Sequence, residues 1–170
     1  GRRVLLVDVD LRRPSLHRQF ELENLAGLSS LLTQQETLDQ VIRSTGQDGL
    51  DVVTSGPVPP SPTELIASEQ MEQLVADMTA RYDVVIFDSP PILGLADAPL
   101  MSALVDGVVF IVESGRARHG SLKASLRRLR TMRPIVLGAV LTMFDAAKSG
   151  HSYSEYSGYD YYRYSSKNSR

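Results

Sequence analysis

The amino-acid sequence predicts an α/β fold in which helices flank a mostly parallel β-sheet. Five short runs are continuously apolar rather than alternating, which is typical of strands buried on both faces. Segments with helical spacing lie between the runs, and this alternation indicates βαβ units. With 170 residues, of which 42% are hydrophobic, the chain is large enough to form one globular core. The predicted strands span residues 4–9, 50–54, 83–88, 107–112 and 135–142.

Two longer helices are expected between these strands. Residues 62–82 carry apolar side chains at near-helical spacing, with Ser61 as a candidate N-cap and Pro62 at the first helical position. Residues 121–133 place leucines on one face and arginines on the other. Right-handed crossovers bring the carboxyl ends of parallel strands to one edge, so a ligand site is expected there. Shorter helices are expected near residues 28–32, 38–43 and 98–104.

Composition and charge exclude several classes of protein. The chain has no cysteine, so disulfides and thiolate metal sites are excluded, and a reducing compartment fits. Its apolar runs are far shorter than the ~20 residues of a membrane-spanning helix, and no signal peptide is visible. The net charge is -2, although residues 116–133 hold seven basic side chains and no acid. A solvated helix face explains this stretch better than a subunit or phosphotyrosine contact, and no nucleic-acid partner is predicted.

Acidic residues stand at the ends of two predicted strands. Asp8 and Asp10 follow the first strand, where they could hold Mg²⁺ or accept a proton from an attacking hydroxyl. The structural alternative is a strand-terminal turn with an Asp–Arg pair involving Arg12 or Arg13. Asp88 ends a second apolar strand, which is the usual form of a Walker B motif. Acids at two such strand ends in one sheet indicate a functional site more strongly than an acid at one strand end would.

A Walker A loop, G-x-x-x-x-G-K-[ST], is absent from the sequence. Residues 115–120 (GRARHG) come nearest, but Ser121 and Leu122 follow where Lys and Ser or Thr are needed. The element that would cradle the β- and γ-phosphates of a nucleotide is therefore missing from these 170 residues.

The carboxyl-terminal segment differs from the rest of the chain. The periodic patterns stop after Thr142, and we expect a folded core at residues 1–146 and a disordered tail at residues 147–170. Six of the seven tyrosines lie in this tail, either as a sticky aromatic segment or as phosphorylation sites. Each phosphate would add roughly -1.5 to -2 charges. The six are Tyr153, Tyr156, Tyr159, Tyr161, Tyr162 and Tyr164.

Several segments resemble the bacterial tyrosine kinases (BY-kinases) of capsule and exopolysaccharide systems. Residues 4–14 (VLLVDVDLRRP) resemble the family's Walker A′ motif, and residues 82–98 (YDVVIFDSPPILGLADA) resemble its Walker B segment. Residues 56–68 (GPVPPSPTELIAS) resemble its proline-rich stretch, and the tyrosine cluster is its distinctive signature. The resemblance implies a P-loop NTPase fold of the MinD/ParA type.

The resemblance also implies an activity and roles for residues. The activity would be ATP-dependent protein-tyrosine autophosphorylation with Mg²⁺, regulating capsular or exopolysaccharide polymerisation and export. Asp8 would lie at the metal and activate the tyrosine hydroxyl, Asp10 would assist, and Asp88 would hold the metal through its water shell. Nucleotide contacts are implied for Asp10, Arg12 and Thr142, the last standing where many relatives have an Asn facing the base.

The implied partners follow from the same family. We expect neighbouring subunits in a homo-oligomeric ring, whose active sites receive each other's tails, and a cognate tyrosine phosphatase. We also expect a two-helix inner-membrane co-polymerase module, in the same or a separate chain. This places the domain at the cytoplasmic face of the bacterial inner membrane.

The missing Walker A loop is the main departure from the family pattern. From it we expect an N-terminally truncated domain, with residues 1–146 as a kinase core lacking the Walker A strand, loop and helix, and inactive by itself. Thr142, which stands where many relatives have Asn, and Ser61, where Asn is also common, are two further departures, and the one at Ser61 is minor. Two other functions remain open at this point: a MinD/ParA-like ATPase switch, and a non-catalytic regulatory module of the export machinery.

Overall fold

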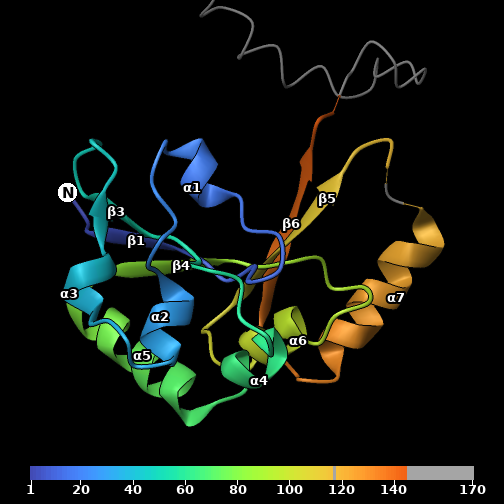
Figure 1. Cartoon of the computed structure of the whole chain (residues 1–170). Helices are drawn as coiled ribbons and strands as arrows, with labels where there is room; N and C mark the ends of the chain where they lie inside the picture. The colour runs from blue at the N-terminus through green and yellow to red at the C-terminus, as the bar shows by residue number, and fades with distance from the viewer. Residues whose placement is uncertain (117, 145–170) are drawn as a thin grey trace, which may run out of the picture.

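The computed structural model describes residues 1–116 and 118–144, and its centre is a four-stranded sheet (Figure 1). The sheet has the order β2-β3-β1-β4. Strand β1 pairs in parallel with β3 and β4, whereas the short β2 pairs antiparallel with β3. The long apolar runs thus form the parallel centre predicted from the sequence. Bounds are β1 Val4–Asp8, β2 Arg43–Ser44, β3 Leu50–Val53 and β4 Val84–Asp88.

A second sheet contains only β5 (Val108–Glu113) and β6 (Val136–Thr142), which pair in parallel. No strand pairing in the described part of the chain joins β4 to β5, so each of these strands has one edge without a strand partner there. Many apolar side chains of this pair and its flanks are exposed to solvent. They are Val109, Ile111, Ile135, Val136, Leu137, Val140, Leu141, Met143 and Phe144.

The helices are short, and in Figure 1 α2, α3 and α5 lie below the four-stranded sheet while α1 lies above it. None of the helices within residues 1–116 and 118–144 is both long and apolar enough to cross a bilayer. Their bounds are α1 Leu16–Gln19, α2 Leu28–Leu32, α3 Leu38–Val41, α4 Pro62–Ile66, α5 Glu69–Arg81, α6 Asp97–Ser102 and α7 His119–Arg130.

The core is formed by β1 and the helices that cover it. Leu5 and Val7 of β1 are fully buried and belong to the same cluster as Leu28, Met71 and Met78. Met71 and Met78 are seven residues apart on α5, so they lie on one face of that helix. Among the strands that the structure describes, the one that ends at Asp8 thus has three of its five residues buried, which fixes the position of its end.

The five predicted strands are confirmed, but the long helix predicted at residues 62–82 is wrong as one element. It is two helices, α4 and α5, because Ser68 stops one and starts the other. The Ser68 hydroxyl accepts a hydrogen bond from the Met71 amide at 3.3 Å and caps α5. Ser61 does precede α4, but its side chain makes no capping hydrogen bond.

Smaller corrections concern other ends and two missed elements. The basic helix begins at His119 rather than residue 121 and ends at Arg130 rather than residue 133. The sequence patterns gave no indication of α1 or β2, which have four and two residues. The expected tail at residues 147–170, including all six of its tyrosines, lies outside the described residues.

Candidate functional site

Two of the predicted acids stand side by side at the carboxyl ends of neighbouring strands. In the parallel register of β1 with β4, Asp8 is the partner of Asp88. The next residue, Val9, donates its backbone N–H to the Asp88 carbonyl at 2.9 Å, which ties the two strand ends together. The predicted sheet edge therefore exists and carries the predicted side chains.

Asp8 holds the loop that leaves β1. Its side chain is fully buried (0% exposed). One oxygen accepts the Asp10 amide at 3.1 Å, and the other accepts the Ser15 and Leu16 amides, each at 3.0 Å. The last two donors stand at the start of α1, which has no capping side chain of its own. A carboxylate has about four lone-pair sites, so this anchor leaves roughly one for another ligand.

Asp10 is half-buried and shapes the turn that follows. Its Oδ1 accepts the backbone amides of Arg12 at 3.1 Å and Arg13 at 2.9 Å. This is the local pattern by which Asp stabilises a turn. Its Oδ2 has no hydrogen-bond partner within the described residues. Asp10 therefore has an oxygen available to a ligand, whereas the Asp8 oxygens are largely occupied.

Asp88 responds electrostatically to both of these acids. Desolvation raises the pKa of the Asp88 carboxyl above its ordinary value, and the negative charges of Asp8 and Asp10 raise it further. A cation between the carboxylates would relieve this repulsion. Asp8 and Asp10 thus lie close enough to Asp88 to act on its carboxyl, which the sequence spacing alone could not establish.

The carboxylates at this edge fit a magnesium ion that is bound together with a nucleotide. Among residues 1–116 and 118–144, no three His, Asp or Glu side chains form a cluster able to hold a metal by themselves. Mg²⁺ commonly uses only one or two protein carboxylates, with waters and substrate phosphates as its other ligands. Asp10 and Asp88 therefore suit a magnesium ion that arrives with a nucleotide, and do not suit a metal caged by protein alone.

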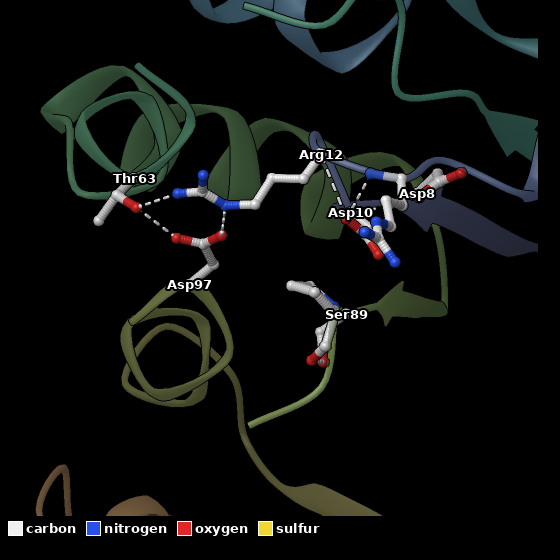
Figure 2. A network of polar contacts seen from close by, with 8 residues as sticks. Asp8, Asp10, Arg12, Thr63, Ser89 and Asp97 are labelled. Carbon is white, nitrogen blue, oxygen red and sulfur yellow. Dashed lines mark hydrogen bonds and ion pairs between the residues drawn. The ribbon is translucent and has the colours of Figure 1, made fainter. Parts of the chain in front are cut away.

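Arg12 points away from Asp8 and Asp10 and joins another network (Figure 2). Its Nε donates to Asp97 Oδ2 at 2.9 Å, and its Nη2 donates to Thr63 Oγ1 at 2.8 Å. The Thr63 hydroxyl donates in turn to Asp97 Oδ1 at 2.6 Å. The structural Asp–Arg pair considered from the sequence exists, but its acid is Asp97. Sequence reasoning missed both Thr63 and Asp97, although each lies in a segment that carries the family resemblance.

The remaining predicted residues lie elsewhere. Thr142 ends β6 on the two-stranded sheet, and its hydroxyl contacts the Val112 carbonyl at 3.4 Å. The structure thus places it on a different sheet from the acids. A shallow hollow on α7, lined by Lys123, Leu126, Arg127 and Arg130, is likewise separate from the acidic edge.

The fold and the acidic edge define a nucleotide-binding class of protein. The family model AAA_31, described as an AAA domain, matches residues 1–133. The septum site-determining protein MinD of Pyrococcus horikoshii, solved with Mg-ADP, superposes with a TM-score of 0.66 at 19% identity. That match covers 83% of this chain and 58% of MinD, and at this identity it shows the fold alone. The predicted P-loop NTPase fold of the MinD/ParA type is confirmed.

More similar proteins narrow the class. Tyrosine-protein kinase YwqD of Bacillus subtilis is 40% identical over 162 residues, which are 95% of this chain and 65% of YwqD. CapB of Staphylococcus aureus is 34% identical over 160 residues, 94% of this chain and 70% of CapB. The kinase domain of Escherichia coli Etk has a TM-score of 0.82 at 35% identity, covering 89% of this chain and 60% of that one. The chain belongs to the bacterial tyrosine kinase family and spans slightly less than two thirds of YwqD.

Proposed function

We propose that this chain forms most of an ATP-dependent protein-tyrosine autokinase domain that regulates capsular or exopolysaccharide polymerisation and export. The observation that carries the proposal is the pairing of Asp8 with Asp88 at the carboxyl edge of the sheet, with Asp10 beside them. Family membership supports the reaction. Phosphoryl transfer needs mainly positioning and charge neutralisation, and clustered carboxylates around Mg²⁺ supply part of both.

The three acids take different roles in this proposal. Asp10 and Asp88 would hold Mg²⁺, directly or through water, and Asp8 would lie at the same ion with one lone pair left unused by the described residues. Magnesium would neutralise charge on the phosphates of ATP. A new bond forms between the tyrosine oxygen and the γ-phosphorus as the bond to ADP breaks, and the phenolic proton passes to a carboxylate. We assign that proton to the remaining lone pair of Asp8, because Asp10 Oδ2, the oxygen of Asp10 that accepts no amide in the described part of the chain, would face the ion.

These 170 residues contain no Walker A loop, so the proposed kinase would need a phosphate-binding loop from another segment. We propose that a strand leading into this loop pairs between β4 and β5. Both strands have a free edge within the described residues, and a parallel strand there would merge the two sheets into one. It would also begin to cover the exposed apolar side chains around Ile86, Val109 and Ile111.

The tail and the partners complete the proposal. We propose that the acceptors are tail tyrosines, which lie outside the described residues: Tyr153, Tyr156, Tyr159, Tyr161, Tyr162 and Tyr164. Neighbouring subunits in a ring would phosphorylate one another's tails, and a cognate phosphatase would reverse the modification. The domain would act at the cytoplasmic face of the inner membrane, joined or docked to a two-helix co-polymerase module. Arg12 and Thr142 stay in the proposal as residues near the nucleotide.

The test uses the full natural protein with Mg-ATP and measures phosphotyrosine by mass spectrometry. The unaltered protein should label, and D10N and D88N should each lose most of the labelling. The matched control is D48N, which removes an exposed acid from the loop before β3, at the opposite edge of the sheet. ATP hydrolysis without tyrosine labelling would instead favour a MinD/ParA-like switch. Neither labelling nor hydrolysis would favour a non-catalytic regulatory module.

A further inference from the structure

Asp97 is a buried carboxylate that the proposed chemistry does not use. Its side chain is 3% exposed, although it begins α6 and could have pointed to solvent. Burial of a charged group is costly unless the group is paired and hydrogen-bonded. Arg12 and Thr63 supply that pairing, and both Asp97 oxygens are engaged by them.

The network joins three elements on one side of Asp8 and Asp10 (Figure 2). Arg12 lies in the loop after β1, Thr63 is the second residue of α4, and Asp97 is the first residue of α6. The loop that follows Asp88 runs through residues 89–96 and ends at Asp97. The Arg12–Asp97 pair therefore ties the loop carrying Asp10 to the loop that leaves Asp88.

The connection from Arg12 to Asp10 is short. The Arg12 backbone amide donates to Asp10 Oδ1 at 3.1 Å, while the Arg12 side chain is held by Asp97 and Thr63. Fixing the guanidinium thus fixes the turn whose amides orient the Asp10 carboxylate. The planar guanidinium can serve Asp97 and Thr63 at once, which a single ammonium group does less well.

We propose that Thr63 and Asp97 form a latch on Arg12 that positions Asp10 relative to Asp88 for binding of a divalent cation with its nucleotide. Thr63 and Asp97 are positioning residues in this proposal, since they contact neither the cation nor the nucleotide. The proposal rests on the proposed function, because it assigns Asp10 and Asp88 to the metal. It predicts that breaking the latch weakens metal binding in a chain that remains folded.

The experiment measures binding of Mn²⁺ in the presence of ATP by electron paramagnetic resonance, using the full natural protein. D97N should weaken Mn²⁺ binding by about 10-fold, the low end of the effect of losing a direct partner of a metal ligand, because Asp97 acts on Asp10 through Arg12. T63V, which removes only the hydroxyl, should weaken it less, by about threefold on the same scale. R12Q should also weaken Mn²⁺ binding. The double variant R12Q/D97N should bind Mn²⁺ no more weakly than R12Q alone, because both substitutions break the same connection.

Arg13 provides the matched control. It carries the same charge next to Arg12, its side chain is exposed, and it makes no side-chain hydrogen bond or ion pair within the described residues. R13Q should therefore keep Mn²⁺ affinity within about twofold, as expected of a surface change away from special contacts. An equal loss in R13Q and R12Q would mean that the positive charge of this loop matters and not the latch, and would overturn the proposal.

The outcomes separate the latch from the proposed function. Wild-type Mn²⁺ affinity in folded D97N and T63V would overturn the latch alone, since the unaltered protein would still bind and label. Absence of Mn²⁺–ATP binding in the unaltered protein would overturn the proposed function, and the latch with it. Thermal melting shows which variants are folded. If D97N does not fold, the nearly isosteric T63V decides.

Discussion

The four-stranded sheet and the β5–β6 pair are built from similarly apolar strands, yet they are covered very differently. Leu5 of β1 is fully buried, whereas Leu137 of β6 is 69% exposed. Helices α2, α3 and α5 lie on one side of the first sheet and help to bury β1 (Figure 1), while an isolated two-stranded sheet is at best marginally stable in water. An apolar sequence therefore predicts a strand that can be buried, but the burial itself depends on which other elements pack against it.

The largest change in stability is expected when a leucine is shortened to alanine in the four-stranded sheet rather than in the β5–β6 pair. Leu5→Ala should lower the free energy of unfolding of the 170-residue chain by about 2–5 kcal/mol, because it leaves a cavity in the core. Leu137→Ala should change it by no more than about 0.5 kcal/mol, because the side chain is already largely in water. Chemical denaturation monitored by circular dichroism measures both values.

The same two substitutions also test the proposal that another strand pairs between β4 and β5. In the full natural protein, the cost of Leu137→Ala should rise toward that of Leu5→Ala if another segment covers the β5–β6 pair. An unchanged small cost there would mean that this face stays open to solvent in the complete protein.

The second largest effect is expected at the end of β1. Asp8→Ala should cost about 1.5–3 kcal/mol or more, because three backbone amides lose a charged acceptor inside the protein. The exposed Asp48→Ala should lie within about 0.5 kcal/mol of the unaltered chain. Urea unfolding compares the two, and similar stabilities would contradict the anchoring role of Asp8.

A smaller effect is expected where the single predicted helix divides. Ser68→Ala removes the side chain that caps α5 and should cost about 1 kcal/mol. Ser61→Ala, at the start of α4, should cost less, because the Ser61 side chain makes no capping bond. The difference between the two serines in thermal melting distinguishes an active cap from an inactive one.

The smallest stability change is expected for Asp88→Asn. This substitution should stabilise the chain, whereas the substitutions above destabilise it. Because the pKa of Asp88 is raised in the folded chain, the folded state loses stability as pH rises through that pKa. Asp88→Asn should therefore melt at a higher temperature than the unaltered chain at pH near 7 without metal. The difference should vanish below the ordinary aspartate pKa of about 3.9, where the carboxyl is neutral in both states. A lower melting temperature for Asp88→Asn at pH near 7 would contradict the charge clustering.

The parts of the fold that the sequence could predict are those specified by neighbours in the chain. Unbroken apolar runs identified the parallel strands, and acids at their ends identified the edge. The break before α5 was also encoded locally, in a serine followed three residues later by the amide it caps. The two-residue β2 has too little sequence to carry a period, so it could not be predicted.

The latch could not be predicted for a different reason. Arg12 and Asp97 are 85 positions apart, and Thr63 and Asp97 are 34 apart. No periodicity connects residues at such separations, since they meet only where α4 and α6 pack together and the loop after β1 reaches them. The sequence likewise identified Asp8 as a candidate ligand without revealing that its oxygens already accept three backbone amides.

The anchoring of Asp8 makes the turn after β1 stiff, although most of it is neither helix nor strand. Amide protons bonded to a buried carboxylate exchange slowly with solvent, so those of Ser15 and Leu16 should be as protected as amides in the sheet. A ligand that binds a turn already held in place loses little conformational entropy in ordering it. Slow deuterium uptake at these two amides would then show that the turn after β1 is already ordered before a ligand binds.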